Sequence, residues 1–349
     1  MLKSIAPADR SVTRRAIGIS ARRRGLSIGW CMLSTPSRVV VGVVLAVGVL
    51  AVSASALMVQ ATLATSLQTA IARTTGSALL MGAIAAGQRA AAGREPEAKG
   101  RGVHTLSLGR SGALAMLVAS TALGLHFWSW MASLDWTSPG SSTVMVTTTP
   151  VWLALLARWI PGEPQLPARG WAGLALGIAG MAMLSLDTTG RVTWFGMGLA
   201  VLGAWTAGAY FVASRLVRER SERPWTTFEV GAATNAGAAL VLMIAGLATG
   251  EFPFEPARAD LLWFAALVLI PQMLGHNAFL WALRHVPTTT VSTVLLLEPA
   301  GTLVLAVIFL GQAASFIEVF GILVLLAGVG LVTVSRRQPP ETTTVEQQA

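Results

Sequence analysis

The chain has 349 residues, 54% hydrophobic and only 12% charged, with a mean hydropathy of +0.65. A soluble domain carries about 25% charged residues, so this composition excludes an ordinary soluble protein, and its hydrophobicity excludes a disordered chain. The net charge of +9 is expected to mark cytoplasmic loops of a membrane protein, and the one cysteine excludes a disulfide framework and cysteine-based metal sites.

Ten apolar stretches follow one another along the chain, and most approach the ~20 residues that a helix needs to cross a bilayer. They cover 38–58, 65–87, 110–131, 139–157, 170–186, 192–214, 228–248, 261–283, 288–310 and 316–335. We therefore predict an all-α integral membrane protein with ten transmembrane helices. Within the fifth stretch, glycines recur at helical spacing and predict a smooth face for close packing of another helix. They are Gly170, Gly173, Gly177 and Gly180.

The two ends of the chain lack apolar periodicity. Residues 1–37 are basic and predict a disordered N-terminal arm, and 336–349 predict a disordered C-terminal tail. Two alternatives stay open for the N-terminus: Val39–Leu57 can be the apolar core of a secretory signal, or translation can begin at Met32. The longest inner loop, 88–109, is basic and glycine-rich and is predicted to be a linker.

The basic residues predict the orientation of the chain. If the N-terminus is cytoplasmic and the chain crosses ten times, all but three of the 25 Lys and Arg residues fall in cytoplasmic segments. The exceptions are Arg73 within a span and Arg191 and Arg258 outside. This positive-inside distribution predicts a multi-pass protein of the cell (plasma or inner) membrane with cytoplasmic N- and C-termini.

The two halves of the chain share an order of landmarks. Pairs at one constant offset are Leu134 with Leu283, Leu156 with Leu305, and Gly162 with Gly311. We expect a first repeat at 38–186 and a second at 192–335, with five spans each. Because five is odd, the second repeat enters the membrane from the opposite side. Inverted repeats recur in secondary transporters, although channels and structural proteins also contain them.

Short motifs lie in the second, sixth and ninth predicted spans and directly before the fourth. They are Leu296-Leu297-Glu298-Pro299 with Phe309-Leu310-Gly311, Ser133-Leu134 with Thr137, Ala204-Trp205-Thr206 with Tyr210-Phe211, and Ala72-Arg73. With the five-plus-five pattern, they make residues 38–335 resemble the drug/metabolite transporter superfamily, EamA type. The resemblance implies a carrier of amino acids, nucleotide sugars, drugs or other metabolites. The chain departs from the family at Gln312, where a Glu is usual.

Arg73 and Glu298 are predicted to lie within spans. A charge near the bilayer centre costs ~2.5–3.5 kcal/mol or more, so Arg73 should face the bundle interior. It either binds a substrate carboxylate or phosphate, or it pairs with Glu298 or reaches an interface. Glu298 precedes Pro299, which removes a backbone donor and can open the helix. Glu298 either couples transport to protons or hydrogen-bonds the freed backbone groups.

Other polar and aromatic side chains complete the predicted site. The candidates for substrate binding are Arg73, His126, Trp205, Tyr210, Asn235, Gln272, His276 and Asn277, and the candidate for proton coupling is Glu298. The histidines and amides either line a cavity or form interhelical hydrogen bonds. Gln272 is one helical turn before His276 and is expected on the same face. The residues expected to form an aromatic wall are Trp128, Trp130, Trp136, Trp205 and Tyr210, with Trp205 and Tyr210 as the candidates for the cavity itself.

The sequence lacks a phosphate-binding glycine loop with Lys and an HExxH motif. We therefore expect no cofactor, no metal and no enzymatic activity. We predict a secondary active transporter that works by alternating access, with export of a small polar or amphipathic metabolite, amino-acid-like or drug-like, as the favoured direction. The expected partners are that substrate, protons and the lipid bilayer, without nucleic acid, and the protein is a monomer or homodimer. A membrane-embedded enzyme and a non-transporting membrane subunit are the alternatives.

Overall fold

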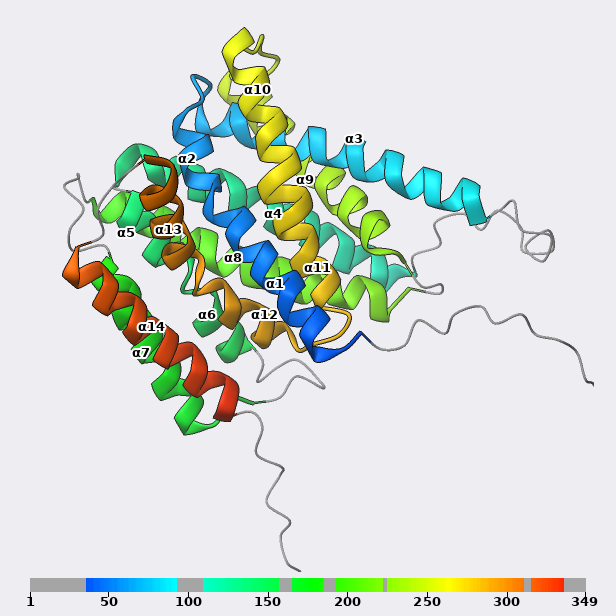
Figure 1. Ribbon diagram of the computed structural model, residues 1–349. Coiled ribbons are helices and arrows are strands. Elements are labelled where there is room, and N and C mark those ends of the chain that lie inside the picture. Colours follow the sequence, from blue (N-terminus) through cyan, green and yellow to red (C-terminus); the bar gives the residue numbers. More distant parts are fainter. Residues whose placement is uncertain are drawn as a thin grey trace, which may run out of the picture. The chain divides into compact units, whose positions relative to one another are not determined.

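The computed structural model describes residues 36–92, 109–137, 139–156, 165–184, 193–221, 225–310 and 315–335. The regular elements of these segments are helices, which confirms the predicted all-α class (Figure 1). The predicted N-terminal arm and linker lie almost entirely outside the described residues. The C-terminal tail and Gln312 lie wholly outside them.

Each of the ten predicted stretches holds one or more helices. In chain order the helices are α1 (Arg38–Ser53), α2 (Ser55–Gln60), α3 (Ser66–Ala92), α4 (Arg110–Trp136), α5 (Pro139–Val146), α6 (Thr149–Leu156), α7 (Ala168–Leu184), α8 (Trp194–Glu219), α9 (Thr227–Thr249), α10 (Arg258–Leu267), the π-helix η3 (Val268–His276), α11 (Asn277–Ala282), α12 (Thr288–Leu295), α13 (Glu298–Leu310) and α14 (Phe316–Ser335). Within the described segments, 7 helical runs are long and apolar enough to cross a membrane. The count of ten spans stays a prediction.

Four of the predicted spans contain an interruption of the α-helix. The interruptions lie at Ala54 between α1 and α2, at 147–148 between α5 and α6, in η3 between α10 and α11, and at 296–297 between α12 and α13. Pro150 and Pro299 are the second residues of α6 and α13. A proline in the first turn of a helix costs no intrahelical hydrogen bond, because that N–H has no partner there. The prolines therefore mark where each helix restarts.

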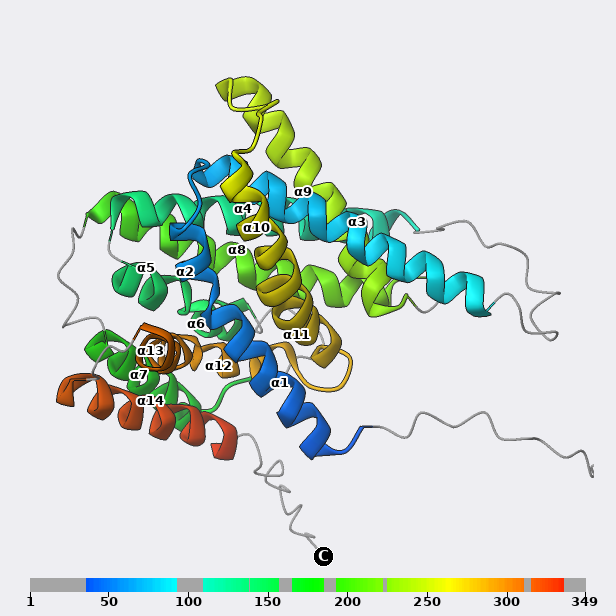
Figure 2. The same ribbon diagram turned by 45° about the horizontal axis from the view of Figure 1, so that its top comes forward.

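Helices α7 and α14 lie side by side, and their backbones touch (Figures 1 and 2). A Cβ atom added to Gly173 would lie 2.8 Å from the Gly328 carbonyl oxygen, and one added to Gly180 would lie 2.5 Å from the Leu325 nitrogen. Approach this close requires residues without side chains at the contact. The predicted smooth glycine face is confirmed, and α14 is the helix that packs on it.

The other principal contacts join α4 to α8, α3 to α9, and α1 to η3 and α11. In the predicted repeats, α1 corresponds to α8 and α4 corresponds to η3, so the contact between α1 and η3 has its counterpart in the contact between α8 and α4. Helix α3 corresponds to α9 and α7 to α14, so each of these two pairs is its own counterpart. This packing supports the predicted inverted repeats at 38–186 and 192–335, which stay a prediction.

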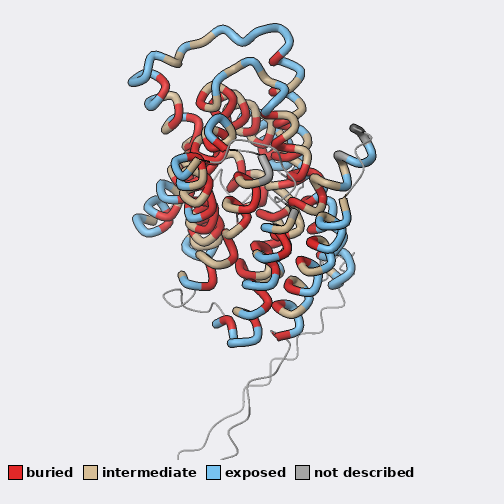
Figure 3. The backbone as a smooth tube through the Cα atoms, turned by 90° about the vertical axis from the view of Figure 1, so that its left-hand side faces the viewer, coloured by how far each residue is buried: buried red, intermediate tan, exposed pale blue. Residues whose placement is uncertain are grey.

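Burial follows the pattern of a membrane protein. Buried residues line the contacts between helices, and exposed ones lie on their outer faces (Figure 3). Large apolar side chains are among the exposed ones: Trp194 is 88%, Leu63 78% and Leu79 71% exposed. Soluble monomers rarely expose broad apolar surface, and lipid covers it here. The protein is a multi-pass membrane protein.

The contact between α7 and α14 makes a prediction about stability. Gly328→Val places a branched side chain against the backbone of α7, so it should destabilise the folded protein by about 1–3 kcal/mol. Gly330→Val is the matched control, because a Cβ at Gly330 meets nothing within 4 Å. Thermal unfolding of both variants in detergent measures the difference. Equal melting temperatures of the two variants would show that the close contact between α7 and α14 does not stabilise the folded protein.

Candidate functional site

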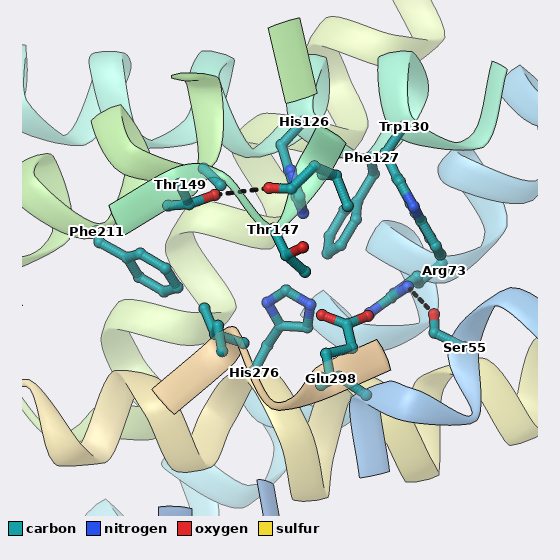
Figure 4. Close-up of a pocket in the computed structure, with 14 residues that line it drawn as sticks. Ser55, Arg73, His126, Phe127, Trp130, Thr147, Thr149, Phe211, His276 and Glu298 are labelled. Atoms are coloured by element: carbon teal, nitrogen blue, oxygen red, sulfur yellow. Dashed lines mark hydrogen bonds between the residues drawn. The ribbon is translucent and has the colours of Figure 1, made fainter. Parts of the chain in front are cut away.

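A cavity of about 40 Å³ lies where several interrupted helices meet (Figure 4). Its polar lining consists of Ser55, Arg73, His126, Thr147, Thr149, His276 and Glu298. Its largest apolar side chains are Phe127, Trp130 and Phe211. Sites for small-molecule ligands enclose about 300–1,000 Å³, whereas this cavity has room for only a few waters. The structure therefore has the site in a closed form.

The interruptions of the helices supply most of this polar lining. Ser55 opens α2 after the break at Ala54, and Thr147 and Thr149 flank the break between α5 and α6. His276 ends η3, and Glu298 begins α13. Irregular backbone inside a membrane is tolerated where it is buried in protein or lines a cavity. The local irregularities thus converge on one place.

Arg73 is fully buried and is held on three sides. Its Nε donates to Oε1 of Gln272 over 3.0 Å, and its Nη1 donates to the Ser55 hydroxyl over 3.0 Å. Its Cζ lies 4.1 Å from the centroid of the Phe127 ring, a cation–π contact. Its Nη2 has no hydrogen-bond partner among the described residues. The guanidinium is therefore fixed in orientation and keeps donor capacity for a ligand.

Gln272 and Asn235 form a layer behind Arg73. The Gln272 amide Nε2 donates to Oδ1 of Asn235 over 3.3 Å, and Asn235 Nδ2 donates to the Gly231 carbonyl over 2.8 Å. Both amides are about 1% exposed. They do not line the cavity, so their role is to position Arg73 rather than to touch a ligand. The chain of bonds links η3 to α9 and α3.

The Glu298 carboxylate points toward the Arg73 guanidinium (Figure 4). No ion pair within 4.0 Å joins these two described residues, so the predicted pairing of Arg73 with Glu298 is absent. The Ser53 hydroxyl donates to the Glu298 backbone carbonyl over 2.9 Å, and Thr302 donates to the Ser53 carbonyl over 3.0 Å. These bonds fasten the start of α13 to α1. The side chain itself is left facing the cavity.

The two predicted histidines meet across the cavity. The ring centroids of His126 and His276 lie 6.0 Å apart, and Phe127 packs on both. His126 Nδ1 donates to the Gly203 carbonyl of α8 over 2.9 Å, which is an interhelical bond. His276 Nδ1 has no partner among the residues that the structure describes. His126 is thus anchored, whereas His276 is free to bond a ligand or water.

The structure separates the predicted site residues into groups. Arg73, His126, His276 and Glu298 line the cavity. Trp205 is 47% exposed, and Tyr210 is buried beside Phe211 but does not reach the cavity. Both lie on other faces of α8 than the one that borders the cavity. Of the residues expected in the aromatic wall, Trp130 lines the cavity, together with Phe127 and Phe211.

Two expectations about the eighth span also fail. His276 lines the cavity and Gln272 does not, because the Gln272 side chain in the π-helix η3 bonds Arg73 and Asn235 instead. Asn277 follows η3, does not line the cavity, and has a buried Oδ1 without a partner in the described part of the chain. Pro271 inside the predicted span signals an irregular helix.

Several lining residues were missed from the sequence. Ser55, Thr147 and Thr149 are small hydroxyl residues of the kind that usually bond their own helix, and Thr149 does so, to the Val146 carbonyl over 2.9 Å. The signal that could have found two of them is the run of three threonines before Pro150. It marks the break in the fourth predicted span, as Glu298 before Pro299 marks the ninth.

Comparison with known proteins matches residues 194–334 to the EamA-like transporter family. These residues form an EamA-like transporter family domain. A protein of Bacillus subtilis (strain 168) called "Uncharacterized transporter YdfC" is 24% identical over 195 residues, or 55% of this chain and 61% of that protein. The Escherichia coli (strain K12) protein "Uncharacterized inner membrane transporter YedA" is 25% identical over 200 residues, or 56% and 62% of the two chains. The match thus spans about three fifths of each relative's length.

A solved crystal structure of another protein has the same fold. It superposes with a TM-score of 0.65 over 86% of this chain and 99% of that chain, at 22% identity. The EamA-like domain begins at α8 and ends within α14. It therefore contributes His276 and Glu298 to the cavity, whereas Arg73 and His126 come from the preceding part of the chain.

The layer behind Arg73 makes a prediction about stability. Gln272→Leu leaves the Arg73 Nε and the Asn235 Oδ1 without partners, which should cost about 1–3 kcal/mol of unfolding free energy for each buried group. Gln60→Leu is the control, because Gln60 is exposed at the end of α2. Chemical unfolding followed by Trp fluorescence compares the two. A loss no larger in Gln272→Leu than in the control would contradict the bonding described here.

Proposed function

We propose that this chain is a secondary active transporter that moves a small amphipathic metabolite across the cell membrane by alternating access. The observation that carries the proposal is the closed cavity, where Arg73 keeps an unpartnered N–H and the Glu298 carboxylate faces it without an ion pair. Intramembrane charges of this kind mark substrate and ion pathways. The EamA-like domain and the two relatives called transporters support the same class of function.

The charges and rings of the cavity suit an amino-acid-like solute. Arg73 can donate to a carboxylate through its free Nη2, and Glu298 can accept from an ammonium group. Phe127, Trp130 and Phe211 offer apolar surface to the rest of the solute. A zwitterion brings both charges at once, so neither protein group stays unpaired in the loaded cavity.

Alternating access requires both ends of the bundle to open in turn. At the first end of α3, the Leu63 amide donates to Asp260 over 2.7 Å and the Ser66 hydroxyl donates to Asp135 over 2.8 Å. At the other end of α3, Arg89 pairs with Glu229 over 2.7 Å. A helix of 27 residues separates these ends by about 40 Å. The bond of Ser66 is exposed and the other two are partly buried, so each end is joined by a few polar contacts that must break when that end opens.

We propose export as the direction and cytoplasmic N- and C-termini, following the distribution of Lys and Arg. The test is flux in proteoliposomes loaded with a mixture of the standard amino acids, followed by mass spectrometry of the external medium. Efflux of unmodified solute supports transport. Chemical change of a solute would favour an enzyme, and neither result would favour a non-transporting subunit.

Arg73 provides the first functional prediction. Arg73→Gln removes the charge that holds the substrate carboxylate, and a charge-assisted hydrogen bond of about 1.5–3 kcal/mol corresponds to about 10- to 100-fold in transport efficiency. Arg73→Lys keeps the charge but not the fork of donors, so its transport efficiency should lie between those of the wild type and Arg73→Gln.

The control for Arg73 is Arg258→Gln, which removes an exposed arginine at the start of α10. Flux is normalised to the amount of folded protein in each preparation, because Arg73 also holds Ser55 and Gln272. Wild-type flux in both Arg73→Gln and Arg73→Lys would contradict the binding role.

Glu298 provides the second prediction. If its carboxylate takes up and releases the coupling proton, Glu298→Gln should lose the stimulation of flux by a pH gradient, and the exchange that remains should need a higher solute concentration, because the ammonium group loses its carboxylate partner. Exchange and gradient-driven flux are measured in the same proteoliposomes. Glu255→Gln, in an exposed loop, is the control. If the flux of Glu298→Gln depends on the pH gradient as wild-type flux does, the coupling role is contradicted.

A further inference from the structure

A second pocket, of about 470 Å³, lies at the end of α8 beside the connection between α11 and α12. Arg215, Arg218 and Glu219 line it from α8, and Arg284 and His285 line it from the connection. It shares no lining residue with the central cavity. Its function therefore does not follow from that of the central cavity.

The pocket has an excess of positive charge. Among the described residues that line it, Glu219 is the one carboxylate, and it accepts from Arg215 Nε over 2.7 Å. Neither Arg218 nor Arg284 forms an ion pair with a described residue. Burial first, and then the charges of Arg284 and Arg218, lower the pKa of His285 below its ordinary value. The imidazole is thus neutral at neutral pH, and the two guanidinium groups dominate the electrostatics of the pocket.

The Arg218 guanidinium is held in place by one hydrogen bond, while two of its nitrogen donors have no partner among the described residues. Its Nη1 donates to the Leu280 carbonyl over 2.8 Å, which fixes the guanidinium between α8 and α11. Its Nε and Nη2 are buried and have no hydrogen-bond partner in the described part of the chain. These two atoms form the parallel pair of donors that an oxyanion accepts side-on. Buried donors of this kind cost free energy until an acceptor arrives.

The pocket lies at a membrane–water boundary. The candidate spans Trp194–Glu219 and Arg258–Ala282 end beside it, and the span Thr288–Leu305 begins there. Lipid phosphates lie at this level, and basic pockets at the ends of spans attract anionic head groups. We propose that Arg218 and Arg284 form a binding site for a phosphate group, supplied first by an anionic phospholipid and otherwise by a free phosphate anion.

The test uses the full-length protein in neutral detergent. Its melting temperature is followed by Trp fluorescence while phosphatidylglycerol, phosphatidylcholine, or inorganic phosphate against chloride at equal ionic strength is added. We expect phosphatidylglycerol to raise the melting temperature more than phosphatidylcholine does. The apparent affinity should fall about tenfold in Arg284→Gln, the size of one charged contact. It should fall further in the double variant with Arg218→Gln.

Arg284→Gln decides the test, because the Arg284 side chain is exposed and forms no hydrogen bond or ion pair with a described residue, whereas Arg218→Gln also removes the bond to Leu280. Arg169→Gln, an exposed arginine at the start of α7, is the matched control and should bind as wild type does. A response to phosphatidylglycerol alone assigns the site to lipid, and a response also to inorganic phosphate assigns it to either source. Two results would overturn the proposal. One is an equal rise in melting temperature with both lipids and no rise with inorganic phosphate. The other is a rise with phosphatidylglycerol that is as large in Arg284→Gln as in the wild type.

Discussion

The structure depends on one constraint, which is that the Arg73 guanidinium needs hydrogen-bond partners in the interior of a membrane protein. Arg73 is fully buried, so each of its donors must find a partner in the protein, in a ligand or in a water of the cavity. Gln272 of η3 and Ser55 of α2 each accept one bond, and Phe127 of α4 covers the plane. One side chain of α3 thus ties together three other elements that are far apart in the sequence. The remaining free donor, Nη2, is what turns a structural anchor into a site.

The interrupted helices follow from the same constraint. A regular helix bonds its own backbone groups and presents only side chains, whereas a broken one exposes backbone groups and end dipoles to its surroundings. Such breaks are stable in a membrane only where protein or a cavity satisfies them. Glu298 and Thr149 each stand beside a proline that restarts a helix. The hydroxyls of Ser53 and Thr302 bond backbone carbonyls near one of these breaks.

Hydropathy predicts which segments are helical, and charge predicts which residues must face inward, so the helices and the convergence of Arg73 with Glu298 could be foreseen. The rotation of a helix about its own axis could not, because both lipid and the interior accept apolar rings. This is why Trp205 points outward and Tyr210 packs away from the cavity. Nor does the sequence pattern show that η3 is a π-helix, or that Gln272 bonds Arg73 and Asn235 instead of lining the cavity with His276.

In the proposed cycle, the missing ion pair between Arg73 and Glu298 is a requirement rather than a defect. A direct pair would join α3 to α13 permanently, and separating it without water would cost several kcal/mol per buried ion. With the two groups held apart, the solute supplies the link, so α3 and α13 are coupled only when the cavity is loaded. A ligand shifts a conformational equilibrium only through its different affinity for the two states. A zwitterion that bridges Arg73 and Glu298 has such a difference, because it reaches both charges only while the cavity is closed around it.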